Sequence, residues 1–500
     1  MFQKIFSELK KNDLSFYCLL FVLTAAVGGG FVFNIPLQIL CLFVLLACFS
    51  FLFVNKSFES KDIFIVLLPL IAIFISYLGA DFQTNVRTAS LGFLNAVLAF
   101  FIASYSNARN KENILTALII FAAWVSFLLF VQALSQTAQT ENAMLLNVNI
   151  AAGFLTLTYP LCFSFVEKSR HPLVFLLIAL LIFAAVIITK SRSAIIIIYL
   201  ASLFYFIKLR KKTSLRMFFA VILFLTLAGI IYSFKAKIGG QSLEDRLVWQ
   251  ETAFLMFKDY PVFGVGFGNF SALFAYYRPE LVLNTLFTHN IVFQLLSETG
   301  FVGFLCFAAA GFVIFKKIVK HAANSAFAIS ILSFILLNLG DYSFFIPANL
   351  TAFFIICAAA LNVKTRLRDR KADAVFVIIP AAVLAYIFFN VLIADNYFKQ
   401  GNVLNGVKNF NGAKGKYLKA LKYDNKNPNY WHILYENELS AGNYKEALEY
   451  LLTAEKYYRY SSQIKSDALY LYKILDDKEN AAKYAKLARE YDKFNPFYMK

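Results

Sequence analysis

The residues of this sequence best suited to chemistry are ionisable side chains beside long apolar segments. His289 stands where a polar loop meets such a segment, whereas His171 and His321 fall in basic turns and His432 in a polar C-terminal region. A neutral imidazole can accept a proton near physiological pH. A titratable group at membrane depth is usually functional, because charge is costly there. We therefore predict that His289 is a catalytic base; a structural or surface histidine is the alternative.

A polar stripe follows His289. Asn290, Gln294 and Glu298 stand four residues apart in an otherwise apolar segment. This spacing puts them on one face of a helix. A polar face at this depth should contact a cavity or protein rather than lipid. We expect Asn290 and Glu298 to support His289.

Four cations accompany this histidine. Lys190 and Arg192 occupy a very short turn between two apolar segments, and Arg246 and Arg278 lie in a long polar segment before His289. Guanidinium groups bind phosphate in a bidentate manner and would stabilise a departing diphosphate. With an imidazole to accept a hydroxyl proton, the set suits glycosyl transfer from a prenyl diphosphate. The alternative is that Lys190 and Arg192 extend toward lipid headgroups.

The same long segment contains a glycine-rich stretch at 261–270, with Gly264, Gly266 and Gly268. No strand precedes it and the spacing is not GxGxxG, so the pattern argues against a dinucleotide site. The glycines indicate a tight turn or a close approach to a bulky ligand, unless the stretch is only a surface loop. The six cysteines fall in apolar segments without zinc spacing, so we predict no metal, no cofactor and no disulfide.

Composition identifies the solvent of most of the chain as lipid. Of its 500 residues, 60% are hydrophobic and only 16% are charged, which exceeds the apolar content of soluble domains. Long apolar segments in lipid must be helices, because lipid offers the backbone no hydrogen-bond partners. We predict an all-α, polytopic bundle of about thirteen membrane helices. The expected spans are 14–33, 35–54, 62–80, 88–106, 113–134, 149–167, 173–189, 193–208, 216–234, 289–315, 325–341, 345–363 and 374–394.

Charge sets the expected orientation. The net charge of +18 could indicate nucleic acid, but the cations recur in alternate turns, as at Arg109 with Lys111 and at Lys316 with Lys317. Basic loops face the cytoplasm, and they contact anionic lipid there. We therefore predict a cytoplasmic N-terminus and no nucleic-acid partner. The long segment 235–288 and the C-terminal region then lie outside.

The sequence predicts two domains. Residues 1–394 form the membrane domain, with 235–288 as its long extracytoplasmic loop, and 395–500 form a helical repeat domain. Ala413, Ala447 and Ala481 repeat at intervals of 34 residues. This period is typical of tetratricopeptide repeats, with a generic helical bundle as the alternative. Such arrays bind partners on a concave surface, so a protein partner is expected there.

Several motifs together resemble the O-antigen ligase and polymerase superfamily of membrane glycosyltransferases. They are the stretch 147–153 leading into a span, the 190–194 turn, Arg246 with Trp249, the glycine-rich stretch 261–270, the pair 289–290 and the triplet 298–300. Their order and spacing look like the family pattern. The resemblance covers the region from about the fifth to the eleventh expected span.

This resemblance implies an inverting, metal-independent transfer on the outer face of a bacterial inner membrane. A hydroxyl would attack a glycan carried on undecaprenyl diphosphate. Arg192 and Arg246 would hold the diphosphate, with Lys190 and Arg278 as further candidates, and His289 would activate the acceptor. Asn290 and Glu298 would support that histidine.

The acceptor is left open by these motifs. Ligases use lipid A core, polymerases use another lipid-linked glycan, and protein O-oligosaccharyltransferases use exported proteins. We favour ligase-like transfer, with polymerase as the nearest rival.

A transporter of the lipid-linked glycan is a non-enzymatic alternative, but it would need polar residues along many spans. A scaffold that uses the membrane part only as an anchor is a further alternative, but one helix would be enough for anchoring, so about thirteen argue against it.

Overall fold

The structure is a computed structural model of the whole chain. It describes residues 13–27, 35–59, 61–134, 147–208, 213–235, 240–320, 325–361, 363–367 and 375–495. Every predicted site residue lies in these ranges. The expected cytoplasmic N-terminal residues before 13, and parts of the basic turns near 210, 322 and 370, lie outside them.

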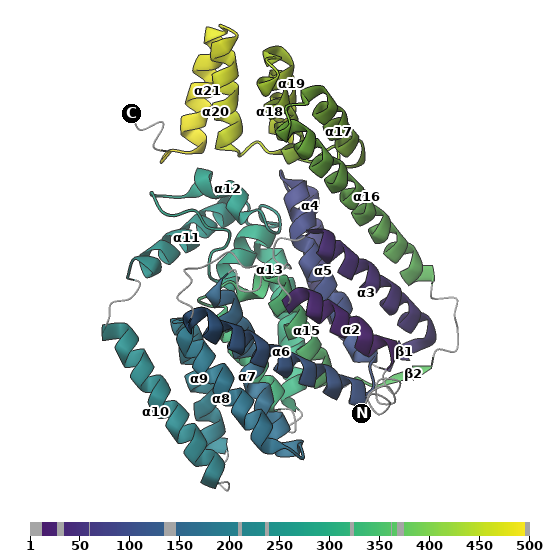
Figure 1. Cartoon of the computed structure of the whole chain (residues 1–500), viewed down its shortest axis with the longest axis vertical. Helices are drawn as coiled ribbons and strands as arrows, with labels where there is room; N and C mark the ends of the chain where they lie inside the picture. Colours follow the sequence, from purple (N-terminus) through teal and green to yellow (C-terminus); the bar gives the residue numbers. More distant parts are fainter. Residues whose placement is uncertain are drawn as a thin grey trace.

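The described chain is almost entirely helical (Figure 1). The membrane part contains α2 (Leu14–Ala25), α3 (Ile35–Asn55), β1 (Lys56–Phe58), η2 (Lys61–Leu67), α4 (Leu68–Gly79), α5 (Gln83–Tyr105), α6 (Ala108–Leu134), α7 (Val148–Lys168), α8 (Pro172–Ile188), α9 (Arg192–Lys208) and α10 (Thr213–Lys235). It continues with α11 (Gly240–Asp259), α12 (Phe270–Tyr277), α13 (Ile291–Lys320), α14 (Ser325–Leu337), η4 (Ser343–Phe345), α15 (Pro347–Leu361), β2 (Thr365–Leu367) and α16 (Val375–Gly406). The C-terminal helices are α17 (Phe410–Tyr423), α18 (Pro428–Ser440), α19 (Tyr444–Tyr457), α20 (Ser462–Ile474) and α21 (Lys478–Tyr491).

A helix occupies each of the expected spans, so the all-α bundle is observed. Among the described residues, six helices are long and apolar enough to cross a membrane: α3, α5, α6, α7, α13 and α16. Others, such as α8 and α15, are apolar but shorter. The protein is therefore a membrane protein with several apolar helices, whereas the number of thirteen spans and their orientation remain predictions.

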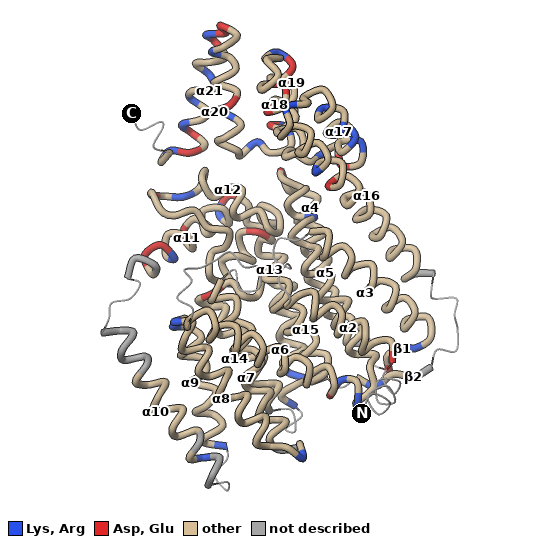
Figure 2. The backbone as a smooth tube through the Cα atoms, viewed as in Figure 1, with Lys and Arg blue, Asp and Glu red and all other residues tan. Residues whose placement is uncertain are grey.

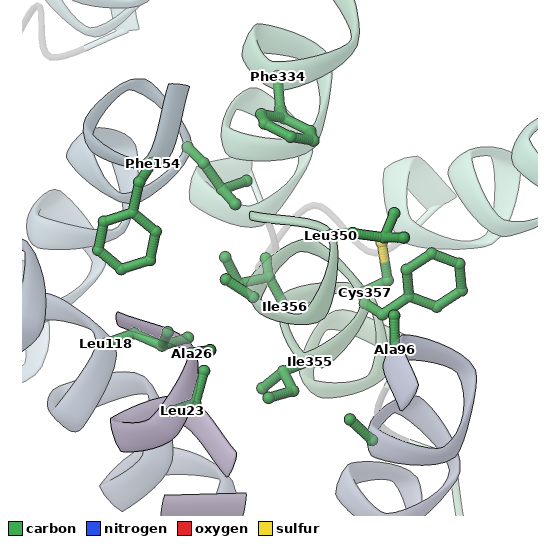
Figure 3. Close-up of a cluster of buried hydrophobic side chains, with 14 of the residues drawn as sticks. Leu23, Ala26, Ala96, Leu118, Phe154, Phe334, Leu350, Ile355, Ile356 and Cys357 are labelled. Atoms are coloured by element: carbon green, nitrogen blue, oxygen red, sulfur yellow. The ribbon is translucent and has the colours of Figure 1, made fainter. Parts of the chain in front are cut away.

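Apolar side chains hold the bundle together. Figure 3 shows Leu23 of α2, Leu118 of α6, Phe154 of α7, Phe334 of α14 and Ile355 of α15 in one buried cluster. Other large apolar side chains point outward on the helices of the bundle, where lipid rather than water is their natural solvent. Figure 2 shows the same division, because charged residues are sparse in the middle of the bundle and frequent toward its ends.

The two ends of the bundle differ. The antiparallel pair β1 and β2 lies at one end, and α17 to α21 lie at the other (Figure 1). The segment expected as a long loop at 235–288 contains two helices, α11 and α12, which lie between the bundle and the C-terminal helices. The expected boundary at 394 falls inside α16, which runs without a break from the bundle to the C-terminal region.

The C-terminal helices repeat with the expected period. Helices α17, α19 and α21 begin at 410, 444 and 478, and α18 and α20 begin at 428 and 462. The residues in left-handed backbone conformation before α17, α19 and α21 also recur at this interval: Lys408, Gly442 and Asp476. The array is thus a periodic helical structure, and its assignment to the tetratricopeptide family remains a prediction.

Candidate functional site

The site begins at the turn before α13. His289 has a left-handed backbone conformation, with φ of 55°. This conformation is uncommon for a residue other than glycine, and such residues cluster at functional sites. Asn290 holds the turn by accepting hydrogen bonds from the backbone N–H groups of Val292 (2.9 Å) and Phe293 (3.4 Å). Asn290 is therefore the N-terminal cap of α13 and fixes the position of His289.

Aromatic rings hold the His289 imidazole. The Trp249 ring stacks on it with centroids 4.8 Å apart, and the Tyr342 ring meets it edge to face at 4.6 Å. Its Nδ1 atom is buried and has no hydrogen-bond partner among the described residues. Burial lowers the pKa of His289 to about 3, and the positive charge of Arg246 acts in the same direction. The imidazole is thus neutral at physiological pH, and it is a weak base as long as no anion offsets the charge of Arg246.

Arg246 of α11 lies beside this histidine. Its Nη1 donates to the Gly340 carbonyl at 2.9 Å, whereas its buried Nε has no partner among the described residues. Burial lowers the pKa of Arg246; Asp341 opposes this shift, and Arg192 adds to it. Arg192 and Arg246 are therefore electrostatic neighbours, although they lie far apart in the chain. Among the described residues, Asp341 is the carboxylate that acts on Arg246, and it offsets only part of the positive charge of the two arginines.

Arg192 reaches the site from a tight helical hairpin. Helix α8 ends at Ile188 and α9 begins at Arg192, so only three residues join them. Lys190 has a left-handed backbone with φ of 56° and an exposed side chain. The Ser191 N–H donates to Thr189 Oγ1 at 3.2 Å. The turn therefore fixes the first residue of α9, while Lys190 points away from protein.

The turn after α14 connects the parts of the site. Three successive carbonyl groups of this turn accept hydrogen bonds: Asn338 from the Ile291 N–H at 2.8 Å, Leu339 from the Asn290 side chain at 3.0 Å and Gly340 from Arg246. The last carbonyls of a helix lack partners within the helix and attract positive charge. The end of α14 therefore positions both His289 and Arg246.

Asp341 of this turn is a site residue that the sequence analysis missed. It is buried, and its Oδ1 accepts from the N–H groups of Tyr342 (2.7 Å) and Ser343 (3.1 Å) and from Ser343 Oγ (2.9 Å). Burial raises its pKa, and these hydrogen bonds and Arg246 oppose the rise. The sequence did contain a signal for this residue. Asp341 is the last residue of the expected span 325–341, and a carboxylate at membrane depth is costly and therefore often functional.

The glycine-rich stretch packs against α13. Helix α13 is interrupted at Gly300, whose φ is 65°, and the Phe301 N–H donates to the Pro261 carbonyl at 2.8 Å. A Cβ at Gly264 would overlap the Glu298 backbone, and a Cβ at Gly300 would overlap the Val262 backbone. Of the two functions expected for the glycines, the tight backbone turn is therefore observed.

Glu298 connects this stretch to His289. Its Oε1 accepts from the Phe270 N–H at 3.1 Å and from Gln294 Nε2 at 2.8 Å. The Gln294 carbonyl oxygen, Oε1, accepts in turn from the Thr288 N–H at 2.7 Å. The polar stripe thus faces protein, and Glu298 lies one hydrogen-bonded side chain away from the residue that precedes His289.

Arg278 makes its contacts elsewhere within the described part of the chain. Its Nη2 binds Asp492 after α21 at 2.6 Å, and its Nη1 contacts the Val282 carbonyl at 3.3 Å. Both partners of the ion pair are largely buried. This ion pair joins the 240–288 segment to the C-terminal repeats.

The 147–153 stretch packs against another part of the site. Asn147 caps α7 by accepting from the Asn149 N–H at 2.8 Å. Asn349 donates to the Ile150 carbonyl at 3.1 Å. A Cβ at Gly153 would overlap Ser343, a hydrogen-bond partner of Asp341. The stretch therefore packs closely against the turn that carries Asp341.

Two further features bear on chemistry. A cavity of about 430 Å³ lies next to the site and is lined almost wholly by apolar side chains of α4, α13, α14 and α15, with Ile291 and Leu339 among them. Within the described ranges, no three His, Cys, Asp or Glu side chains gather as metal ligands.

A family comparison bears on this cluster. Residues 177–308 match the O-antigen ligase family. The O-antigen ligase match contains His289, Arg192, Arg246 and Glu298, whereas Asp341 and the C-terminal repeats lie beyond it. A comparison with curated proteins found no match. The match suggests a glycosyltransferase-like ligase, and this family implies a lipid-linked glycan and an acceptor as substrates in general. The apolar helices support a membrane location.

Proposed function

We propose that the protein transfers a glycan from undecaprenyl diphosphate to an acceptor hydroxyl at the outer face of the bacterial inner membrane. The observation that carries this proposal is the cluster of His289, Arg246 and Arg192. A neutral imidazole beside two guanidinium groups suits a reaction in which a hydroxyl loses a proton and a diphosphate departs.

The two arginines are assigned to the diphosphate. The Arg246 Nε is buried and unpartnered, and Arg246 interacts unfavourably with Arg192. An anion between them would remove this repulsion and accept charge-assisted hydrogen bonds. Lys190 is exposed in the same turn as Arg192 and is assigned to the outer part of the diphosphate. Arg278 is instead assigned a positioning function, because Asp492 already engages its guanidinium.

The apolar cavity is assigned to the prenyl chain. It begins at Ile291 and Leu339, which neighbour Asn290 and the Gly340 carbonyl of the site. A prenyl chain there would leave its diphosphate end facing Arg246. Apolar lining suits an isoprenoid, because burial of apolar surface is favourable and needs no polar partner.

The reaction is a single displacement. The acceptor oxygen forms a bond to the anomeric carbon, and the bond from that carbon to the diphosphate oxygen breaks. The diphosphate leaves with the electron pair, and the hydroxyl proton passes to His289. Attack opposite the leaving group inverts the anomeric configuration. Asp341 balances part of the Arg246 charge and keeps the turn after α14 in place.

Transfer in a reconstituted system tests this function. Purified protein is supplied with undecaprenyl-diphosphate oligosaccharide and with lipid A core, lipid-linked glycan or pilin-like protein as acceptor. We expect His289→Ala and Arg246→Ala to reduce transfer by about 100-fold or more. The matched controls are His171→Ala and Arg489→Ala, whose side chains are exposed and outside the cluster.

The outcomes separate the candidate functions. The labelled acceptor distinguishes ligase, polymerase and protein O-oligosaccharyltransferase. Undiminished transfer in both site variants would contradict the proposed site. Movement of the lipid-linked glycan across the vesicle membrane without transfer to any acceptor would favour the transporter alternative.

A further inference from the structure

A second cavity lies at the end of the bundle that carries β1 and β2, opposite the C-terminal repeats (Figure 1). Its volume is about 360 Å³, within the range of about 300 to 1,000 Å³ that is usual for ligand pockets. The walls come from η2, α5, the last turns of α13 and the residues beside the two strands.

The lining is divided between charge and apolar surface. Lys317, Lys320 and Lys364 contribute three cations, and Glu59 contributes one carboxylate. The remaining lining is apolar and includes Phe100 and Val313. Val313, Lys317 and Lys320 are four and three residues apart, so α13 presents them on one face. Positive charge beside an apolar recess matches a molecule with an anionic head and a hydrocarbon tail.

Helix α13 relates this cavity to the membrane. It has 30 residues, begins beside His289 and ends at Lys320. The part of α13 after the interruption at Gly300, residues 301–320, spans about 30 Å, roughly the thickness of a hydrocarbon core. The lysines of its last turns therefore lie at the headgroup level opposite the candidate active site. This is the level at which basic pockets between helices bind anionic lipid.

The strand pair holds one wall of the cavity. The Glu59 N–H donates to the Lys364 carbonyl at 3.1 Å, directly after the pairing of Phe58 with Thr365. Lys364 is thus held by backbone contacts rather than by a free loop. The backbone of this lysine is therefore fixed beside α13, which reduces the ordering cost of binding.

We propose that this cavity binds one anionic phospholipid. The phosphate lies among Lys317, Lys320 and Lys364, and an acyl chain enters the recess beside Phe100 and Val313. The three lysines outnumber the single glutamate, so the site selects an anionic over a zwitterionic headgroup. The bound lipid joins the end of α13 to the β1–β2 pair.

Lipid counting by native mass spectrometry tests this site. The full chain is purified in neutral detergent, stripped of lipid and titrated with phosphatidylglycerol or phosphatidylcholine. We expect one tightly bound phosphatidylglycerol, and Lys320→Gln should weaken its binding about five-fold. The control is Lys316→Gln, because Lys316 is also exposed on α13 but does not line the cavity. It should leave binding unchanged.

Two further measurements complete the test, one with a variant of the recess and one with inorganic phosphate as competitor. Val313→Trp fills the recess and should weaken phosphatidylglycerol even though every lysine remains. Inorganic phosphate at matched concentration should not displace the lipid. Equal losses in Lys320→Gln and Lys316→Gln, no preference over phosphatidylcholine, or displacement by phosphate alone would overturn the proposal. This experiment measures lipid binding and not glycan transfer, so a negative result here is independent of a negative result in the test of the proposed function.

Discussion

At the scale of single residues, the proposed reaction depends on a histidine kept neutral by its surroundings. Burial and the Arg246 cation lower the pKa of His289 to about 3, while Trp249 and Tyr342 hold the ring. The backbone of His289 is left-handed, so its position is determined by the caps and turns around it.

This environment predicts the pH dependence of the free enzyme. Because the pKa of His289 lies below its ordinary value, the imidazole remains neutral as pH falls through 6.5 and gains a proton only near pH 3. We therefore expect kcat/KM to show no loss from His289 between pH 8 and pH 5. A profile of kcat/KM measured at substrate concentrations well below KM checks this. A decrease in kcat/KM near pH 6.5 that is absent in His289→Gln would contradict this expectation.

At the scale of elements, the site is a junction of helix ends. The start of α13 and the side chain of Arg246 both meet the carbonyl groups at the end of α14. The glycine-rich stretch fits into the interruption of α13 at Gly300. The site therefore depends on backbone conformation at positions that make no contact with substrate.

Substitution within α13 tests this dependence. Gly300→Ala places a Cβ against the Val262 backbone at a φ of 65°, so we expect a loss of stability of about 1 to 3 kcal/mol. The control is Gly311→Ala in the same helix, where a Cβ meets nothing within 4 Å. It should be neutral or slightly stabilising. Thermal unfolding in detergent measures both, and equal effects would show that the interruption is not required.

At the scale of the whole molecule, the C-terminal repeats pack directly on the membrane part. The Tyr458 ring stacks on Phe82 with centroids 4.6 Å apart, and its hydroxyl donates to the Ala272 carbonyl at 2.8 Å. Arg87 binds Asp424 at 2.5 Å. Trp249, which stacks on His289, belongs to the same hydrophobic cluster as Tyr460 of the repeat region. The repeats thus help to hold the site.

The buried ion pair of Arg278 tests this coupling. Asp492→Ala leaves a largely buried guanidinium without its carboxylate, and such a loss costs about 3 to 5 kcal/mol. We expect faster amide hydrogen exchange in α12 and α21, together with slower transfer. Asp395→Ala is the control, because its partner Lys399 is mostly exposed and the pair should contribute little. Unchanged exchange in Asp492→Ala would show that the repeats dock without this pair.

The sequence by itself determined the helices of the membrane part and most residues of the candidate site. Apolar length predicts a helix in lipid because no other backbone hydrogen bonds are available there. The 34-residue period predicted where the C-terminal helices repeat, because it depends on local spacing alone. His289 and Arg246 were identifiable because ionisable groups are rare at membrane depth.

The tertiary structure alone decided which of these residues meet. Arg192 and Arg246 become neighbours only in the folded bundle, where α9 packs against α14 and Arg246 binds the turn after α14, which also carries Asp341. Arg278 belongs with Asp492, more than two hundred residues away. Local sequence patterns specify helices and their faces, but contacts between distant segments depend on the packing of the whole bundle. For that reason, the spacing of residues in the sequence could identify these charged residues as candidates, but it could not show which of them are in contact.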